Sequence, residues 1–569
     1  MIKLNHVVVL FCAITVFTYT LSPLHGADKA APNFILFYMD DFSWNQTSFR
    51  MMDSEPDSQH SFYETPQLEK LAKRGLRFTN SYCPTPTCTG SRVSIQFGQT
   101  SARIQYRFVH DVLSQYQRPN GYSDEIAMGG ILKAAGKNYT TAHFGKGAGS
   151  AVGKLKDYGY DVTDEYEKHG PNGNGHGDYI SMSGVKKPLP PDDPKRIYSL
   201  TRDAVKFVNE NAGERPFFMM VSHYAAHVKH AALQKDIDRF QKKYNALPNK
   251  PTDKKELKRF SQQNNVLYGA MVYEADWSLG EIIKAVKAKG QLDNTYIIFT
   301  SDNGSECLPR DENGHYYSGP LQMGKYSAFE GGIRVPFVVA GPGIKAGAQC
   351  DVPIIQWDIL PTLHDLSCSK SPLPTKVDGG SLRDVFVKGN MGKVKRKIPG
   401  LVFHFPSYYQ APISVIRMGD YKFMRHMNTG ETKLFNMVED YSEQNDLSKS
   451  LPEKTAEMQR ALLTYIKEVD GGDVKEVYEA YFRWIDEIET KNKENYLSKL
   501  ARLEKEKPAD YAKQKVALEK QLAQKEREYF AKREICKGQM TWPSWYDSAK
   551  STTVKRLGID KQGNVINKK

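Results

Sequence analysis

Two apolar stretches, each ending in oxygen-bearing side chains, constrain the fold of this 569-residue chain most. The stretch PNFILFYM leads directly into Asp40 and Asp41, and the stretch NTYIIFTS leads into Asp302 and Asn303. A short continuous apolar run is typical of a strand that is buried on both faces of a parallel sheet. Sites in such sheets lie at the carboxyl ends of the strands. We therefore expect both polar pairs to lie at one edge of a buried parallel sheet.

Helix patterns alternate with further strand patterns around these stretches. In TPQLEKLAKRG, Leu68 and Leu71 recur at helical spacing and Gly75 follows as a helix end. The segments KNYTTAHFG and RPFFMMVS read as strands, and residues 275–286 read as a helix. This alternation predicts an α/β fold, in which helices flank a large, mostly parallel central sheet.

The pattern changes after residue 400. ISVIRMGDYKFMRHMNTGETKLFNM consists of short alternating strands with a turn at residues 428–430, which is typical of an antiparallel meander. From Glu453 on, apolar residues recur at helical spacing in two stripes separated by Pro508. We expect a helical hairpin with a solvated face. A coiled coil that binds a partner is the alternative, although the heptads are not sustained.

We therefore predict four segments. Residues 1–27 form a signal peptide, 28–400 a catalytic α/β domain, 401–450 a smaller α+β subdomain with an antiparallel sheet, and 451–569 a helical extension and tail. The signal is indicated by a short basic start, an apolar run over residues 7–21 and small residues near Gly26. It predicts a secreted or periplasmic protein. An uncleaved membrane anchor is the alternative, because His25 lies where a small residue is preferred. No apolar run later in the chain is long enough to span a bilayer, so stable membrane insertion is not expected.

The formal net charge of +13 favours a polyanionic partner. No nucleic-acid-binding motif accompanies this charge, so an anionic small molecule or glycan fits better than a nucleic acid. The seven cysteines are scattered and do not form a disulfide framework. Two of them, Cys83 and Cys88 in SYCPTPTCTGSR, lie close together, and Cys88 could be a bridge, a core thiol or a reactive group.

Several side chains fit the chemistry of a hydrolytic site. Each of the two polar pairs alone could be a helix cap or a turn, but together they offer three carboxylates and an amide oxygen to a hard divalent cation. Lys146 and Lys325 lie in glycine-flanked loops, which allow the backbone to approach an oxyanion. In HYAAHVKH, three histidines follow a strand, and one could serve as a general acid, or all could form a surface cluster.

These segments, in this order, resemble the type I sulfatases of the alkaline-phosphatase superfamily from about residue 31 to about residue 450. PNFILFYMDDFSW looks like the opening strand of that family, and CTGSRVSIQFG is similar to its signature, in which the cysteine is oxidised to formylglycine. TSDNG, LQMGKYSAFEGGIRVP, QWDILPTLHDL and KLFNMVEDYSEQNDLS are similar to its later segments.

The resemblance implies a role for each candidate residue. Cys88 would become the formylglycine nucleophile through a formylglycine-generating enzyme, and Arg92 would lie beside it. Lys146 and Lys325 would bind the sulfate oxygens, and His227 would face the leaving-group oxygen. A divalent cation, commonly Ca²⁺ with Mg²⁺ as the alternative, would be held by Asp40, Asp41, Asp302, Asn303 and the group formed from Cys88.

Two positions depart from the family pattern. Gly90 stands where Pro or Ala is usual, and Ala148 stands where the family commonly has a histidine; His143 or His223 could replace it. The function implied is a secreted sulfatase acting on a sulfated carbohydrate. The alternatives are a phosphodiester or phosphonate monoester hydrolase of the same superfamily and an inactive protein that binds sulfated polymers.

Overall fold

The computed structural model describes residues 31–109, 111–147, 154–164, 178–180, 186–188, 191–228, 230–306, 317–407 and 412–540. At its centre lies an eight-stranded sheet with the order β13-β2-β12-β9-β1-β8-β4-β5. Neighbouring strands are parallel except at β12, which is antiparallel to both β9 and β2. In chain order the strands are β1 (Asn33–Met39), β2 (Leu76–Phe78), β4 (Thr140–Gly145), β5 (Val162–Thr163), β8 (Phe217–Ser222), β9 (Thr295–Ser301), β12 (Phe337–Ala340) and β13 (Ala348–Cys350). The predicted mostly parallel sheet is confirmed.

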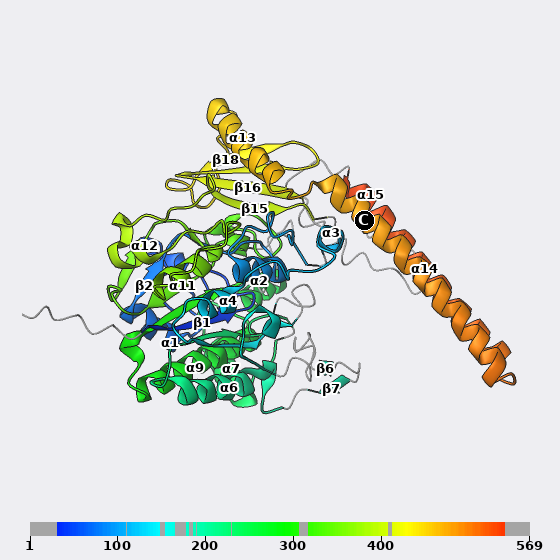
Figure 1. Cartoon of the computed structure of the whole chain (residues 1–569), viewed down its shortest axis with the longest axis horizontal. Helices are drawn as coiled ribbons and strands as arrows, with labels where there is room; N and C mark the ends of the chain where they lie inside the picture. Colours follow the sequence, from blue (N-terminus) through cyan, green and yellow to red (C-terminus); the bar gives the residue numbers. More distant parts are fainter. Residues whose placement is uncertain are drawn as a thin grey trace, which may run out of the picture.

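The central strand β1 sends its side chains into two separate cores. Ile35 and Phe37 pack against one layer of helices, and Phe34 and Leu36 pack against the other. Because both faces are covered, all seven residues of β1 are buried, which explains why its sequence is an unbroken apolar run. In Figure 1 the first layer lies below the sheet and contains α6 (Ile197–Asn211), α7 (Gln234–Asn245) and α9 (Val266–Ala288). The second layer lies above and contains α2 (Cys88–Phe97), α4 (Met128–Lys133) and α11 (Ile359–Leu366).

A smaller antiparallel sheet packs on the second layer, as predicted. Its order is β15-β16-β17-β18. The strands are β15 (Leu401–Phe405), β16 (Ile413–Met418), β17 (Tyr421–His426) and β18 (Thr432–Asn436), and α13 (Pro452–Glu468) covers them. Lys422 joins this sheet to the main body through a buried ion pair with Glu330 at 2.9 Å, and it also pairs at 2.7 Å with Glu443 in the segment after β18.

The other helices and strands are short or peripheral. The helices are α1 (Pro66–Arg74), α3 (Val112–Gln117), α8 (Lys254–Gln263), α10 (Glu330–Ile333) and α12 (Arg383–Lys388). The strands are β3 (Ser81–Tyr82), β6 (Asp178–Ile180), β7 (Lys186–Pro188), β10 (Tyr317–Ser318), β11 (Leu321–Gln322) and β14 (Ile354–Ile355).

Two long helices, α14 (Val474–Glu506) and α15 (Tyr511–Met540), form an antiparallel hairpin that projects from the body; we call residues 474–540 the helical arm (Figure 1). The base of the arm packs on the body through a cluster of buried residues that includes Val477, Ile485 and Phe108. Beside this cluster, Arg107 forms a buried ion pair with Asp111 and donates to the Gly471 carbonyl oxygen at 2.6 Å. The predicted helical extension is confirmed.

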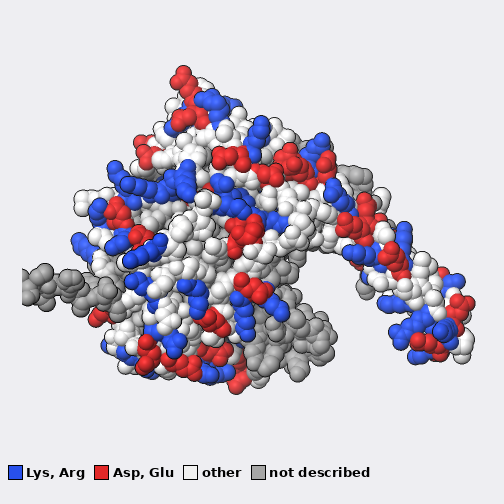
Figure 2. Space-filling view, in the orientation of Figure 1, with Lys and Arg blue, Asp and Glu red and all other residues white. Residues whose placement is uncertain are grey.

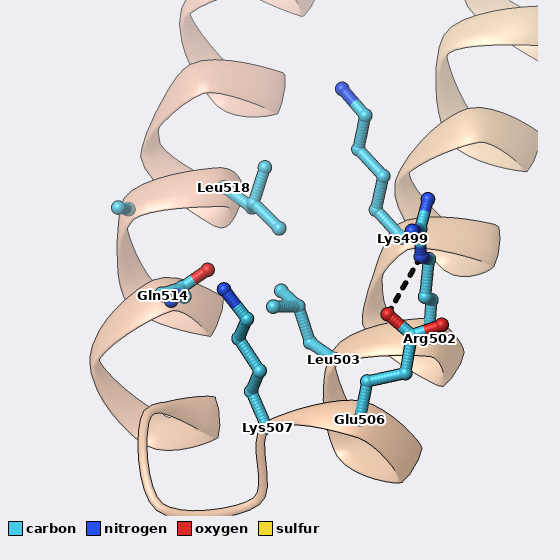
Figure 3. A pocket seen from close by; sticks show the side chains of 8 residues that line it. Lys499, Arg502, Leu503, Glu506, Lys507, Gln514 and Leu518 are labelled. Carbon is cyan, nitrogen blue, oxygen red and sulfur yellow. Dashed lines mark hydrogen bonds and ion pairs between the residues drawn. The ribbon is translucent and has the colours of Figure 1, made fainter.

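Beyond its base, the arm is solvated and carries charges of both signs (Figure 2). Near the tip, a hollow of about 400 Å³ lies between α14 and α15 (Figure 3). Leu503 and Leu518 form its apolar part, and Lys499 and Lys507 reach over it. None of the residues expected to carry chemistry lines this hollow. The domain limits 28–400, 401–450 and 451–569 stay predictions, and the signal segment 1–27 lies outside the described residues.

Buried histidines should make stability depend on pH. The His404 ring is buried, with Nε2 donating to the Gly472 carbonyl oxygen at 2.8 Å and Nδ1 2.7 Å from Ser414 Oγ. Burial, together with Arg107, lowers its pKa to about 3. Between pH 6.5 and this value the unfolded chain binds a proton that the folded chain does not, so stability falls as the pH falls. At pH 5 the loss is about 2 kcal/mol.

In His404→Gln, the difference in unfolding free energy between pH 7 and pH 5 should therefore shrink by about 2 kcal/mol, as measured by urea denaturation. Ser414→Ala is the control, because it removes one of the two hydrogen bonds of the ring and keeps the titrating ring. An equal change of the pH difference in both variants would contradict the prediction.

Candidate active site

The register of the central strands brings the predicted polar residues to one edge of the sheet. Met39 at the end of β1 pairs with Ser301 at the end of β9, so Asp40 and Asp302 leave adjacent strands at the same level. On the other side of β1, β8 pairs with β4, and the Lys146 amide donates to the Ser222 carbonyl oxygen at 2.7 Å. Four parallel strands therefore end around one buried site, as the sequence predicted.

Each carboxylate of the site has a cationic partner. Lys146 Nζ contacts Asp40 Oδ2, and Lys325 Nζ donates to Asp41 Oδ2 at 2.6 Å. Arg92 Nε and Nη2 both lie 2.8 Å from Asp302 Oδ2. All six side chains are buried, with Lys146 the most exposed at 8%. Buried charges are tolerated only when they are paired in this way.

Both acids of the Asp40–Asp41 pair face the site because the strand ends at Met39, directly before them. Successive side chains of a strand point to opposite faces. Asp41, however, has the left-handed backbone conformation (φ 59°), which aspartate tolerates better than most residues. Its Oδ1 accepts a hydrogen bond from Asn303 Nδ2 at 2.6 Å, and its amide donates to Asp302 Oδ1 at 3.0 Å.

Cys88 and Arg92 enter the site from α2. Cys88 is the first residue of this helix, after Thr87 as N-cap, and Arg92 lies one turn later on the same face. The sulfur of Cys88, one oxygen of Asp40 and one oxygen of Asp302 lie within 4.8 Å of one another. The Cys88 side chain therefore lies in the candidate metal-binding cluster and at the start of a helix, where backbone amides favour negative charge.

The crowded acids have different pKa values. Burial and the neighbouring Asp40 raise the pKa of Asp302 to about 7, although Arg92 opposes the rise. Burial also raises the pKa of Asp41. For Asp40, burial acts in the same sense, but Lys146 and His227 outweigh it and hold the pKa below its usual range. A divalent cation would lower the pKa of all three acids, because opposite charge favours the carboxylate.

The ligand set fits a hard divalent cation. Asp40 Oδ1 and Asn303 Oδ1 are buried and accept no hydrogen bond from any described residue. Oxygen atoms from carboxylates and amides are the ligands that Ca²⁺ and Mg²⁺ prefer. The cluster therefore offers two open acceptor atoms, on Asp40 and Asn303, beside the carboxylates of Asp41 and Asp302. The cation site that the sequence predicts here, with Cys88 as a further ligand, stays a prediction.

His227 lies at the edge of this cluster. Its Nε2 is 3.8 Å from Asp41 Oδ2, and its Nδ1 is 2.5 Å from the Val228 carbonyl oxygen. Because a carbonyl only accepts, Nδ1 carries the proton and Nε2 faces the site. Burial, with Lys325 and other cations nearby, lowers the pKa of His227 well below its ordinary value.

Neither histidine suggested as a substitute at Ala148 has a described hydrogen bond to the site residues. His223 Nε2 lies 3.1 Å from Ser278 Oγ, and its ring packs on Phe37 beneath the sheet. His143 packs edge-on against Tyr160, and burial lowers its pKa to about 3. Ala148 itself lies outside the described residues.

The two cysteines of the signature have different surroundings. Cys83 is fully buried and free, and its thiol contacts the carbonyl oxygens of Thr85 at 3.1 Å and Ile333 at 3.3 Å. It is a core thiol, and it does not form a bridge to Cys88.

Sequence reasoning missed two residues that support the site. Ser222 ends β8 and accepts a hydrogen bond from Arg92 Nη1 at 2.5 Å. Lys195 is fully buried and donates to the carbonyl oxygen of His227 at 2.8 Å. Lys195 occurs in PPDDPKR, a segment whose prolines and charges indicate only a surface turn.

The unusual Gly90 has a structural cause. A Cβ at this position would lie 2.7 Å from Thr85 Oγ1 and 3.0 Å from the Arg107 carbonyl oxygen. The glycine thus allows α2 to approach the Thr85 turn and the Arg107 segment closely. The departure from Pro or Ala reflects local packing around the signature.

Hydrolases of the alkaline-phosphatase superfamily combine an open, mostly parallel sheet with buried metal-binding acids and oxyanion-binding cations at its carboxyl edge. The present chain has such a sheet, with three buried acids and three buried cations at its carboxyl edge, which is the arrangement of that class.

Comparison with known proteins gives the family. The sulfatase family model matches residues 32–367, more than half of the chain. The chain is 28% identical over 403 residues to an ulvan-active sulfatase of Formosa agariphila, covering 68% of this chain and 72% of that protein. It is 27% identical over 387 residues to the N-acetylgalactosamine-6-sulfatase of Homo sapiens, covering 63% and 66%. The crystal structure of Ps i-CgsB is 25% identical, with a TM-score of 0.59 and coverage of 77% and 93%. The chain belongs to the sulfatase family and is a sulfuric ester hydrolase by membership.

The packing of Gly90 can be tested by a double-mutant cycle. Gly90→Ala should lower the unfolding free energy by about 1–3 kcal/mol, because its methyl group overlaps Thr85. In a Thr85→Ala background, which removes the nearest atoms, the same substitution should cost less. Equal costs in both backgrounds, measured by denaturant unfolding, would show that Thr85 does not determine the need for glycine.

Proposed function

We propose that this protein removes sulfate from a sulfated carbohydrate with a formylglycine that is formed from Cys88. The observation that carries the proposal is the position of Cys88. Its sulfur lies at the start of α2, within 4.8 Å of oxygens of Asp40 and Asp302, while Lys146 and Lys325 are bonded to Asp40 and Asp41.

Part of the chemistry would come from two groups that the chain acquires, the formylglycine and a divalent cation. A hydrated formylglycine offers two hydroxyls on one carbon, of which one attacks sulfur and the other allows sulfate to be expelled. A divalent cation would be held by Asp40, Asp41, Asp302, Asn303 and the group formed from Cys88, and we propose that it is Ca²⁺. Such a cation lowers the pKa of a bound hydroxyl and attracts the sulfate oxygens.

Binding of the sulfate group and protonation of the leaving group would be carried out by side chains of the protein itself. Lys146 and Lys325 would bind the sulfate oxygens, and Arg92 would orient the Asp302 carboxylate. Binding of the anionic sulfate ester would favour the charged ring, so that His227 takes up a proton at Nε2 and gives it to the departing ester oxygen, while Nδ1 keeps its own proton on the Val228 carbonyl oxygen. Burial of the two lysines and of Arg92 strengthens their interaction with a bound anion, because water screens it little.

Two observations and one prediction support a sulfated carbohydrate as the substrate. The relatives include a sulfatase active on ulvan and one named for N-acetylgalactosamine 6-sulfate. The net charge of +13 favours an anionic partner. The proposed signal over residues 1–27 would deliver the enzyme to the periplasm or the exterior, where such polymers occur. Within the described part of the chain, no helix is long and apolar enough to cross a membrane.

The nucleophile can be tested with a matched pair of cysteine variants. Cys88→Ala should abolish hydrolysis of an aryl sulfate and of a panel of sulfated sugars, whereas Cys83→Ala should retain most of the activity, because Cys83 is a core thiol. Mass spectrometry of the active protein should find formylglycine at position 88 and no residues 1–27. An active protein whose Cys88 is wholly unmodified, or that prefers aryl phosphate to aryl sulfate, would contradict the proposal.

The metal site can be tested by calorimetry on protein stripped with a chelator. Asn303→Ala removes the open amide oxygen and should weaken Ca²⁺ binding by on the order of tenfold or more. Asn294→Ala is the control, since this asparagine contacts the Ala31 carbonyl oxygen at 3.3 Å, away from the site. Unchanged Ca²⁺ affinity in Asn303→Ala would show that Asn303 is not a ligand of the cation. Tighter binding of Mg²⁺ than of Ca²⁺ would show that Mg²⁺ is the preferred metal.

A further inference from the structure

Lys195 lies beneath the segment that carries His227. Its side chain is fully buried, and Nζ donates to the His227 carbonyl oxygen at 2.8 Å. Burial lowers its pKa to about 8, with Asp40 and Asp41 opposing the shift. At neutral pH it is therefore mostly an ammonium group, placed among the charges of the site.

The turn that presents Lys195 is built by specific contacts. Lys195 (φ 56°) and Arg196 (φ 57°) are consecutive non-glycine residues in the left-handed conformation, which is rarely adopted and must be imposed by the surroundings. The Asp193 carboxylate accepts from the amides of Tyr198 at 2.9 Å and Ser199 at 3.1 Å. These contacts tie the turn to the first residues of α6.

A buried ion pair holds the other side of the turn. Arg196 Nη1 donates to Asp164 Oδ2 at 2.9 Å, and both side chains are about 4% exposed. With the backbone fixed on both sides, the Lys195 side chain is directed inward, toward the loop after β8.

The contact made by Lys195 restrains the backbone that orients the His227 ring. Lys195 holds the carbonyl oxygen of His227, and the ring of His227 holds the next carbonyl oxygen, that of Val228, through Nδ1 at 2.5 Å. Two successive peptide groups are thus fixed by polar contacts. The result is a ring whose Nε2 faces Asp41 at 3.8 Å.

We propose that Lys195 is a positioning residue, which fixes the loop of His227 so that Nε2 delivers its proton to the leaving group. This inference rests on the proposed role of His227 as the acid. A positioning residue acts through its partner, so its removal should reproduce the kinetic signature of losing that partner.

The test is a double-mutant cycle with Lys195→Met and His227→Gln, measured on aryl sulfates whose leaving groups span a range of pKa. Lys195→Met should lower kcat about tenfold or more for poor leaving groups and much less for good ones, because only poor leaving groups need protonation. His227→Gln should show the same trend, and the double variant should be no slower than His227→Gln alone. Lys195→Arg should recover part of the activity.

Lys243→Met is the matched control. Lys243 also donates to a backbone carbonyl, that of Phe62 at 2.7 Å, but it lies on α7, away from the site. Its loss should leave the leaving-group dependence unchanged. As a second readout, NMR of the imidazole nitrogens should show a changed His227 tautomer balance in Lys195→Met and none in Lys243→Met.

Additive effects in the cycle, or a loss in Lys195→Met that is equal for all leaving groups, would overturn the proposal. Failure of Lys195→Met to fold where Lys243→Met folds would also overturn it, because Lys195 would then serve stability. No leaving-group dependence in His227→Gln itself would instead refute the acid role of His227, and the role of Lys195 with it.

Discussion

The structure depends on the mutual neutralisation of three carboxylates and three cations at one edge of the sheet. Asp40, Asp41 and Asp302 are each bonded to a lysine or arginine, and none of the six side chains is accessible to bulk water to any large extent. Removing one partner from a buried pair costs about 3–5 kcal/mol. The aligned carboxyl ends of the parallel strands make the arrangement possible, because they bring together residues more than 250 positions apart.

This arrangement also explains why the site can act on an anion. A surplus of positive groups would attract sulfate but could not be buried, and a surplus of acids would repel it. Pairing lets both kinds of group remain in a dry site. Small changes, such as binding of a cation or an oxyanion, can then redistribute the hydrogen bonds of Lys146 and Lys325 at modest energetic cost, since a replacement partner of opposite charge is available.

Much of the fold and of the site could be predicted because the signals are local. β1 and β9 are continuous apolar runs that end in acids, and the arm has apolar residues at helical spacing. The pairing of each lysine with one aspartate could not be predicted, because it depends on tertiary geometry. Lys195 was missed since its left-handed turn lacks glycine, and the reason for Gly90 lies in Thr85 and Arg107, which no spacing rule connects to it.

The base of the helical arm has a consequence for how this enzyme can be shortened or recombined. Arg107 binds the Gly471 carbonyl oxygen through its side chain, while its own carbonyl oxygen lies against Gly90, two residues from Cys88. A truncation at residue 450 would therefore remove a support of the helix that begins at Cys88. Among the side chains that the structure describes, Ile485 is the last fully buried apolar one of the arm. Beyond it, Glu487 still accepts a hydrogen bond from Tyr116 at 3.0 Å and Tyr529 packs against the cluster at the base, so a joint for fusion or exchange should leave these two contacts in place.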